Sequence, residues 1–158
     1  MEADRERAAI RRDALGIAAY AAAFGASFGA VSVASGLSVM QTCALSVVMF
    51  TGASQFAFVG VVGGGGSALA AIPAALLLGL RNTFYGVRMA GILGVRGRRS
   101  ALAAPLVIDE TTAMAIARPT RRAQRYAFWV TGASLFVLWN LGTLAGALGG
   151  SAVGEPET

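Results

Sequence analysis

The sequence has no lysine, no histidine and only one cysteine, and 13% of its 158 residues are charged. Without histidine, the chain lacks the side chain that most often serves as a general base or metal ligand. Cys43 has no partner for an internal disulfide, and it is interpreted as a small packing residue. No nucleophile–base pair, metal-ligand spacing or phosphate-binding loop is recognisable. We therefore expect neither an enzyme nor a bound cofactor or metal.

All 13 basic residues are arginines, and they lie in short segments between apolar runs. A nucleic-acid-binding protein would instead carry a basic face on a soluble module. The pattern therefore argues against a nucleic-acid partner. Arginines that flank apolar segments are typical of membrane proteins, in which they mark the cytoplasmic side.

Apolar and small residues make up for the missing charge. The chain is 56% hydrophobic, contains 21 glycines and has a mean hydropathy of +0.64. Soluble domains carry about a quarter charged residues, whereas helices in lipid tolerate glycine and use small residues to pack closely. The composition predicts an all-α protein, a polytopic bundle of transmembrane helices surrounded by a lipid bilayer.

About five hydrophobic segments approach the ~20 residues that a helix needs to span the hydrocarbon. They cover residues 15–33, 37–62, 67–93, 101–117 and 126–148. We expect residues 1–13 to form a cytoplasmic N-terminal segment, amphipathic or loose. Residues 14–149 would form a single transmembrane domain, and residues 150–158 a polar C-terminal tail. Gly25 and Gly29 form a Gly-x-x-x-Gly helix-packing pattern.

The arginine clusters conflict with five simple crossings. The N-terminus, residues 96–99 and residues 118–125 should all be cytoplasmic, yet single crossings would separate the last two clusters. The conflict disappears if segments 37–62 and 101–117 are broken or re-entrant hairpins. Such irregular backbone is tolerated where it is buried in protein, and both segments carry polar residues in the middle. A plain five-helix topology is the alternative.

Asp109 and Glu110 lie inside an apolar segment, about ten residues from either basic cluster. A charge within a bilayer is costly, so such residues usually face a cavity or a partner. One of the two carboxylates could carry a proton or receive a substrate ammonium group. The alternative is a structural ion pair with an arginine elsewhere in the bundle.

Arg81, Tyr85 and Arg88 are spaced to share one helix face. Arg88 is close enough to the basic cluster at 96–99 to extend towards the membrane surface. Arg81 is deeper, and it could hold a carboxylate in a bidentate pair or be the structural partner of Asp109. Asn82 adds two donors and an acceptor beside it.

Gln55 follows Gly52-Ala53-Ser54 in the middle of the second apolar segment. It could close a hydrogen bond between helices or line a substrate route. Gly52 would allow close approach of the backbone, and free backbone groups at a helix break bind charged substrate ends in transporters.

Three short segments, taken in order, resemble the AzlC family, the large subunit of branched-chain amino acid exporters. They are Thr51–Phe56 (TGASQF), Leu80–Gly86 (LRNTFYG) and Asp109–Thr111 (DET). The resemblance extends from about Leu15 to Pro156. Family members continue beyond the position of Pro156 with further hydrophobic sequence, so the family-typical C-terminal part is expected to be missing here.

The resemblance implies a multi-pass exporter in the bacterial inner membrane that works with a small AzlD-like membrane subunit. It would move valine, leucine, isoleucine or analogues outward, driven by the proton gradient. The arginine-rich N-terminus would be cytoplasmic, and the protein could assemble as a homo-oligomer.

On this hypothesis six residues line the substrate or proton pathway: Ser54, Gln55, Arg81, Asn82, Asp109 and Glu110. Asp109 or Glu110 would carry the coupling proton or meet the ammonium group. Arg81, with Asn82, would meet the carboxylate, and Gln55 with the break near Gly52 would line the route. Two other functions stay open: a non-transporting structural or assembly subunit, and a channel.

Overall fold

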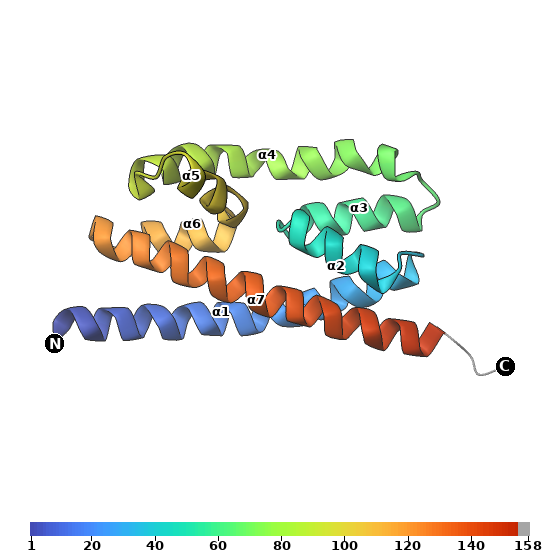
Figure 1. The fold of residues 1–158 in the computed structure, drawn as a ribbon, viewed down its shortest axis with the longest axis horizontal. Coiled ribbons are helices and arrows are strands. Elements are labelled where there is room, and N and C mark those ends of the chain that lie inside the picture. Colours follow the sequence, from blue (N-terminus) through green and yellow to red (C-terminus); the bar gives the residue numbers. More distant parts are fainter. Residues whose placement is uncertain (155–158) are drawn as a thin grey trace. The chain divides into compact units, whose positions relative to one another are not determined.

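The computed structural model describes residues 1–154, and every regular element in that range is a helix. Within it, three helices are long and apolar enough to cross a membrane: α1 (Glu2–Ala34), α4 (Ala68–Leu93) and α7 (Arg121–Gly154) (Figure 1). The shorter helices are α2 (Val39–Val48), α3 (Ala53–Gly63), α5 (Arg98–Ala103), the 3-10 turn η1 (Ala104–Leu106) and α6 (Asp109–Ile116). The prediction of an all-α transmembrane protein is confirmed.

The chain packs as two compact units. Unit 1 contains Met1–Tyr20 and Arg81–Phe136, and unit 2 contains Ala21–Leu80 and the described residues from Val137 onward. Helices α1, α4 and α7 each contribute one part to each unit. The predicted single membrane domain over residues 14–149 stays a prediction. The expected polar tail is helical up to Gly154, and residues 155–158 lie outside the described residues.

The N-terminal segment is helical from Glu2 onward and continues without interruption into the first apolar segment. Ile10 and Ala14 on this segment are fully buried, in a cluster that includes Met114 of α6 and Ala123 and Ala127 of α7. Because polar and charged residues occupy the other faces of this stretch, the first turns of α1 are amphipathic.

The second apolar segment of the sequence is broken, as predicted. Ser38 and Gln41 form a capping box at the start of α2, and α3 starts after Gly52, whose φ of +60° lies in the left-handed region that favours glycine. A Cβ atom placed on Gly63, the last residue of α3, would lie 2.6 Å from Ser35 Oγ, just ahead of α2. Helices α2 and α3 therefore form a hairpin whose outer ends lie together (Figure 1).

The fourth apolar segment is also broken, at residues 107 and 108 between η1 and α6. Thr111 orders this break, because its hydroxyl accepts from Ile108 N at 3.1 Å and donates to Leu106 O at 2.5 Å. The end of α4 meets the start of α7, since Arg121 and Arg125 donate to Gly91 O and Ile92 O at 3.1 and 2.9 Å. The chain between α4 and α7 therefore begins and ends on the same side of unit 1.

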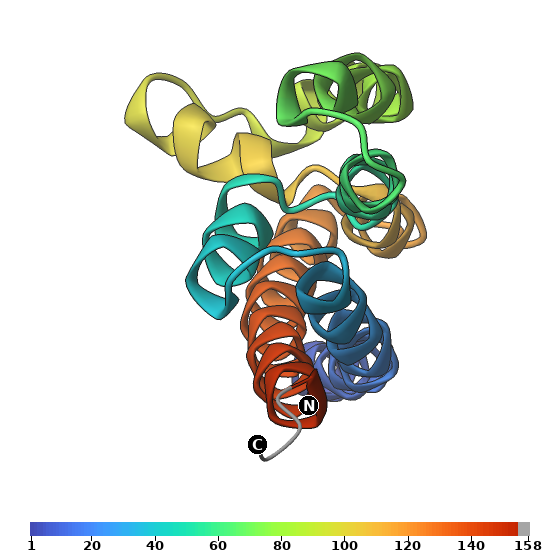
Figure 2. The ribbon, with the colours of Figure 1, turned by 90° about the vertical axis from the view of Figure 1, so that its right-hand side faces the viewer.

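The joint between α1 and α7 in unit 2 is built from small residues of both helices. A Cβ on Gly25 would lie 2.6 Å from Trp139 O, and one on Gly29 would collide with Thr143 O. In return, Cβ atoms on Gly142 and Gly146 would collide with Ala22 O and Ala26 O. Contacts that advance together along both helices mean that α1 and α7 run parallel here. Figure 2 shows the two helices side by side, nearly end-on. The packing pattern predicted from Gly25 and Gly29 has its partner in α7.

Candidate functional site

An ion pair joins two of the predicted site residues in unit 1. Arg81 Nη2 of α4 lies 2.9 Å from Asp109 Oδ2, at the first residue of α6. The Tyr85 hydroxyl, one turn along α4 from Arg81, interacts with the same carboxylate. The break before α6 positions Asp109, because the helix begins there rather than running past it. Of the two roles foreseen for Arg81, the structure contains the pair with Asp109.

The second oxygen of this carboxylate, Asp109 Oδ1, is buried and has no hydrogen-bond partner among the described residues. The same is true of Oδ1 of Asn82, the residue after Arg81 in α4. A buried acceptor without a donor is unfavourable, so such groups usually bind water, a proton or a ligand. The site therefore has unused capacity for a proton or for a cationic donor such as an ammonium group.

Glu110 and Arg88 take no part in this ion pair. Both side chains are exposed in their unit, although Glu110 is the neighbour of Asp109 in the sequence. Because adjacent residues of a helix point about 100° apart, the first turn of α6 directs only one of its two carboxylates to Arg81. The structure thus distinguishes two acidic residues that the sequence left equivalent.

The other predicted residues, Ser54 and Gln55, lie in unit 2, in the first turn of α3. Both are buried, and Gln55 has no exposed surface. Gln55 Oε1 accepts a hydrogen bond from Gly52 N at 3.1 Å. The side-chain amide is therefore folded back over the N-terminus of its own helix, at the break between α2 and α3.

Several buried polar atoms of unit 2 have no partner among the described residues. They are Gln55 Nε2, Trp139 Nε1, Thr51 Oγ1 and Thr42 Oγ1. The indole ring of Trp139 lies at the break, since its Cη2 would be 3.8 Å from a Cβ atom placed on Gly52. In lipid, polar groups must be satisfied within the protein or by a ligand or water, so the break is incompletely satisfied.

Sequence reasoning missed four residues around this break. Trp139 stacks on Phe28 at a ring-centroid distance of 6.4 Å, and the hydroxyls of Ser46 and Thr143 are hydrogen-bonded at 3.2 Å. These residues are far apart in the chain and lie in long apolar runs, so their proximity left no local pattern. The sequence pattern that indicates a contact between α7 and α1 is the four-residue spacing of Gly142, Gly146 and Gly150. The glycines of α1 have the same spacing.

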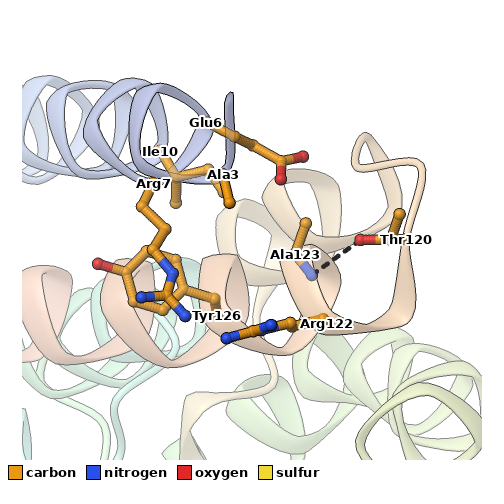
Figure 3. A pocket seen from close by; sticks show the side chains of 8 residues that line it. All are labelled: Ala3, Glu6, Arg7, Ile10, Thr120, Arg122, Ala123 and Tyr126. Carbon is orange, nitrogen blue, oxygen red and sulfur yellow. Dashed lines mark hydrogen bonds between the residues drawn. The ribbon is translucent and has the colours of Figure 1, made fainter. Parts of the chain in front are cut away.

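Unit 1 also contains a pocket of about 50 Å³, where the start of α1 meets the start of α7 (Figure 3). Arg7 stacks over the Tyr126 ring at 5.5 Å, and Thr120 caps α7 by accepting from Ala123 N at 3.2 Å. Glu6 and Arg122 also line the pocket. Because its lining mixes both charges, we assign it no role in the pathway.

Three long apolar helices, together with two broken helix pairs that carry polar groups at their breaks, define a polytopic helical membrane protein. Comparison with known proteins narrows this class. The family model described as AzlC protein matches residues 16–153, so the chain belongs to the AzlC family. The resemblance expected from the sequence is confirmed.

The chain is also similar to the "Inner membrane protein YgaZ" of Escherichia coli (strain K12). The two are 29% identical over 132 residues, which is 80% of this chain and 54% of that protein. The chain therefore spans about half the length of this curated relative. No solved structure matches the chain.

Proposed function

We propose that this protein belongs to a secondary exporter of branched-chain amino acids in the bacterial inner membrane, driven by the proton gradient. The observation that carries the transport hypothesis is the Arg81–Asp109 ion pair within the apolar helices of an AzlC-family protein. Intramembrane ionisable residues typically mark substrate or proton routes. The substrate class and the small AzlD-like partner subunit rest on the family resemblance.

Asp109 is the proposed carrier of the coupling proton. When ionised, it neutralises Arg81 at 2.9 Å, and the pair has no net charge. When Asp109 binds a proton, Arg81 is left without its counter-charge, which is costly within a bilayer. The protonated and ionised states therefore differ in the arrangement that α4 and α6 prefer. Proton coupling requires two conformations that differ in their affinity for the proton, and these two arrangements of α4 and α6 would supply them.

Asn82 and Glu110 have secondary roles in this proposal. Asn82 follows Arg81 in α4 and has a buried, unpartnered Oδ1, so we assign it the holding of a water on the proton route. Glu110 is exposed in its unit, so we assign it to the entrance of the route rather than to the coupling step. Ser54 and Gln55 line the substrate route in unit 2.

The proposed topology has three crossings and two re-entrant hairpins. Helices α1, α4 and α7 cross, while α2–α3 and α5–α6 each enter and return on one side. The arginines of the N-terminus, of residues 96–99 and of residues 118–125 are then all cytoplasmic, as expected for positive segments. Two observations support this arrangement: the parallel α1 and α7 in unit 2, and the contacts of Arg121 and Arg125 with the end of α4.

The lipid bilayer suits the exposed apolar surface of α4. The side chains of Leu69, Leu77, Phe84 and Val87 are each at least 70% exposed. A surface of this kind is normal in lipid and would be a liability in water.

The direct test is efflux of L-valine from loaded cells that co-express the chain and its small subunit, with and without a proton gradient. We expect gradient-dependent efflux that Asp109→Asn uncouples, while the matched change Glu110→Gln retains most of it. Gradient-dependent efflux from Asp109→Asn cells would refute the coupling role. If the purified protein binds the small subunit but no amino acid, that result would favour an assembly subunit instead.

A further inference from the structure

The break between α2 and α3 combines a helix N-terminus with buried donors that have no acceptor. The first N–H groups of any α-helix lack partners within the helix, and the N-terminus carries a partial positive charge. Gly52, at the N-cap of α3, has no side chain with which to accept from them. Gln55 Oε1 instead accepts from Gly52 N. The Nε2 of the same amide is therefore held at the helix start.

Gln55 Nε2 is an unusual group to leave there. The side chain has no exposed surface, and Nε2 has no partner among the described residues. Trp139, whose ring lies against the same break, is 8% exposed and holds a second buried donor, Nε1, without a partner. Thr51 adds a buried hydroxyl next to Gly52, which can donate or accept. The two N–H donors, Gln55 Nε2 and Trp139 Nε1, have no acceptor among the described residues.

The same fold contains an internal comparison, because Gln41 occupies the equivalent position in α2. Its Oε1 accepts from Ser38 N at 2.8 Å, the same contact that Gln55 Oε1 makes with Gly52 N. Gln41, however, is exposed, so water can satisfy its Nε2. Capping alone therefore does not require the burial that Gln55 has.

The missing acceptor is most naturally an anion. The described part of unit 2 contains no charged side chain, since residues 21–80 and 137–154 include no Asp, Glu, Lys or Arg. An anion at the break would meet the positive end of α3 and neutral donors, with no competing carboxylate in its own unit. Thr51, Gly52 and Ala53 are only partly buried, so the start of α3 is reachable from that side.

We propose that the α3 N-terminus, with the side-chain amide of Gln55 and the indole of Trp139, binds the carboxylate group of the transported amino acid. This inference rests on the proposed function, and it replaces the carboxylate role expected of Arg81. Arg81 already holds a carboxylate, that of Asp109, at 2.9 Å. In transporters, the unpaired N–H donors at the N-terminus of a broken helix hold anionic groups of the substrate within the membrane.

The test uses the full chain, purified in nanodiscs, with Trp129→Phe in every variant so that Trp139 is the remaining tryptophan. Trp139 fluorescence is titrated with L-valine, with L-valinamide, in which a neutral amide replaces the carboxylate, and with acetate. We expect L-valine to change the emission and L-valinamide to bind much more weakly. Gln55→Leu should weaken L-valine binding by about tenfold or more, the effect of losing a hydrogen bond to a charged group.

Two variants keep the test interpretable. Gln41→Leu removes the matched amide from α2 and should leave L-valine binding unchanged. Gln55→Glu is nearly isosteric and retains the acceptor for Gly52 N, so it should fold, but its own carboxylate occupies the start of α3 and should abolish the response. Thermal unfolding confirms that each variant is folded before it is titrated.

The subsite is overturned if Gln55→Leu and Gln55→Glu bind L-valine as the parent does, or if L-valinamide binds as well as L-valine. Gradient-dependent valine efflux together with that result would leave the proposed function standing and this inference wrong. If acetate binds through Gln55 while L-valine gives no response, the carboxylate subsite stands and the branched-chain substrate is wrong. If no carboxylate perturbs Trp139, water alone fills the break and the subsite is refuted.

Discussion

Arg81 of α4 and Asp109 of α6 face each other across 2.9 Å, from two segments separated by the basic connection and by α5. The pair links the long helix to the broken one within unit 1. Each charge compensates the other where neither has another opposite charge within ion-pair distance in the described residues. The loss of one partner should therefore cost more than the loss of both.

We expect Arg81→Ala to lower the free energy of unfolding by about 1 kcal/mol, because it leaves Asp109 without its counter-charge while the 45% and 40% exposure of the two side chains limits the effect. Asp109→Asn added to Arg81→Ala should recover most of this loss. The measurement is the thermal unfolding midpoint of the purified protein in detergent. Arg88→Ala serves as the control, since Arg88 lies on the same helix and takes no part in the ion pair. A double variant as unstable as Arg81→Ala would show that the two charges are not coupled.

The glycines of α7 offer a matched pair for testing the α1–α7 joint. A Cβ on Gly146 would collide with the backbone of Ala26, whereas one on Gly149 meets nothing within 4 Å. We expect Gly146→Ala to cost about 1–3 kcal/mol through overpacking. Gly149→Ala should be neutral or stabilise by up to about 1 kcal/mol, because alanine is the better helix former. Equal thermal midpoints for the two variants would argue against the close contact.

The proposed topology predicts which surface positions share one side of the membrane. In a Cys43→Ser background, cysteines at Ser100 and Thr120 should both react with a membrane-impermeant maleimide only from the cytoplasm. A cysteine at Ser67, between α3 and α4, should react from the opposite side. All three positions are exposed. Labelling of Ser100 and Thr120 from opposite sides would exclude the hairpin between α4 and α7.

The contact between α4 and α7 can be tested with two neighbouring arginines. Arg125 Nε donates to Ile92 O at 2.9 Å, near the carboxyl end of α4, where a positive charge also favours the helix dipole. Arg125→Ala should therefore lower the stability by about 1 kcal/mol. Arg122 lies in the same turn of α7 but makes no hydrogen bond to α4 among the described residues, so Arg122→Ala should have little effect. Thermal midpoints that fall equally for both would indicate a general charge effect.

The five apolar segments and both breaks could be predicted from the sequence, because membrane-length hydrophobicity and mid-segment polar residues are local signals. The last apolar segment starts at residue 126, after the arginine cluster at 118–125, whereas α7 already begins at Arg121. Thr120 accepts from Ala123 N and starts the helix earlier. A threonine just after Pro119 is a capping signal that could have located this start.

The site was predictable in its residues but not in its pairings. Arg81 and Asp109 were each conspicuous as charges in apolar segments, and their pairing was one of two alternatives. The choice between Asp109 and Glu110 depends on the residue at which α6 begins, and helix boundaries are the least certain part of a sequence prediction. Trp139 became relevant only because α7 passes the break, a long-range contact without a local pattern.

The glycine joint of α1 and α7 has a consequence for the order in which the protein is assembled. Gly25 and Gly29 leave the ribosome early, whereas Gly142 and Gly146 follow more than a hundred residues later. During that interval the Gly-x-x-x-Gly surface of α1 has no partner within its own chain, although it is already a surface on which helices pair in lipid. Until α7 is synthesised, α1 can therefore pair with a helix of another chain, however stable the finished joint is.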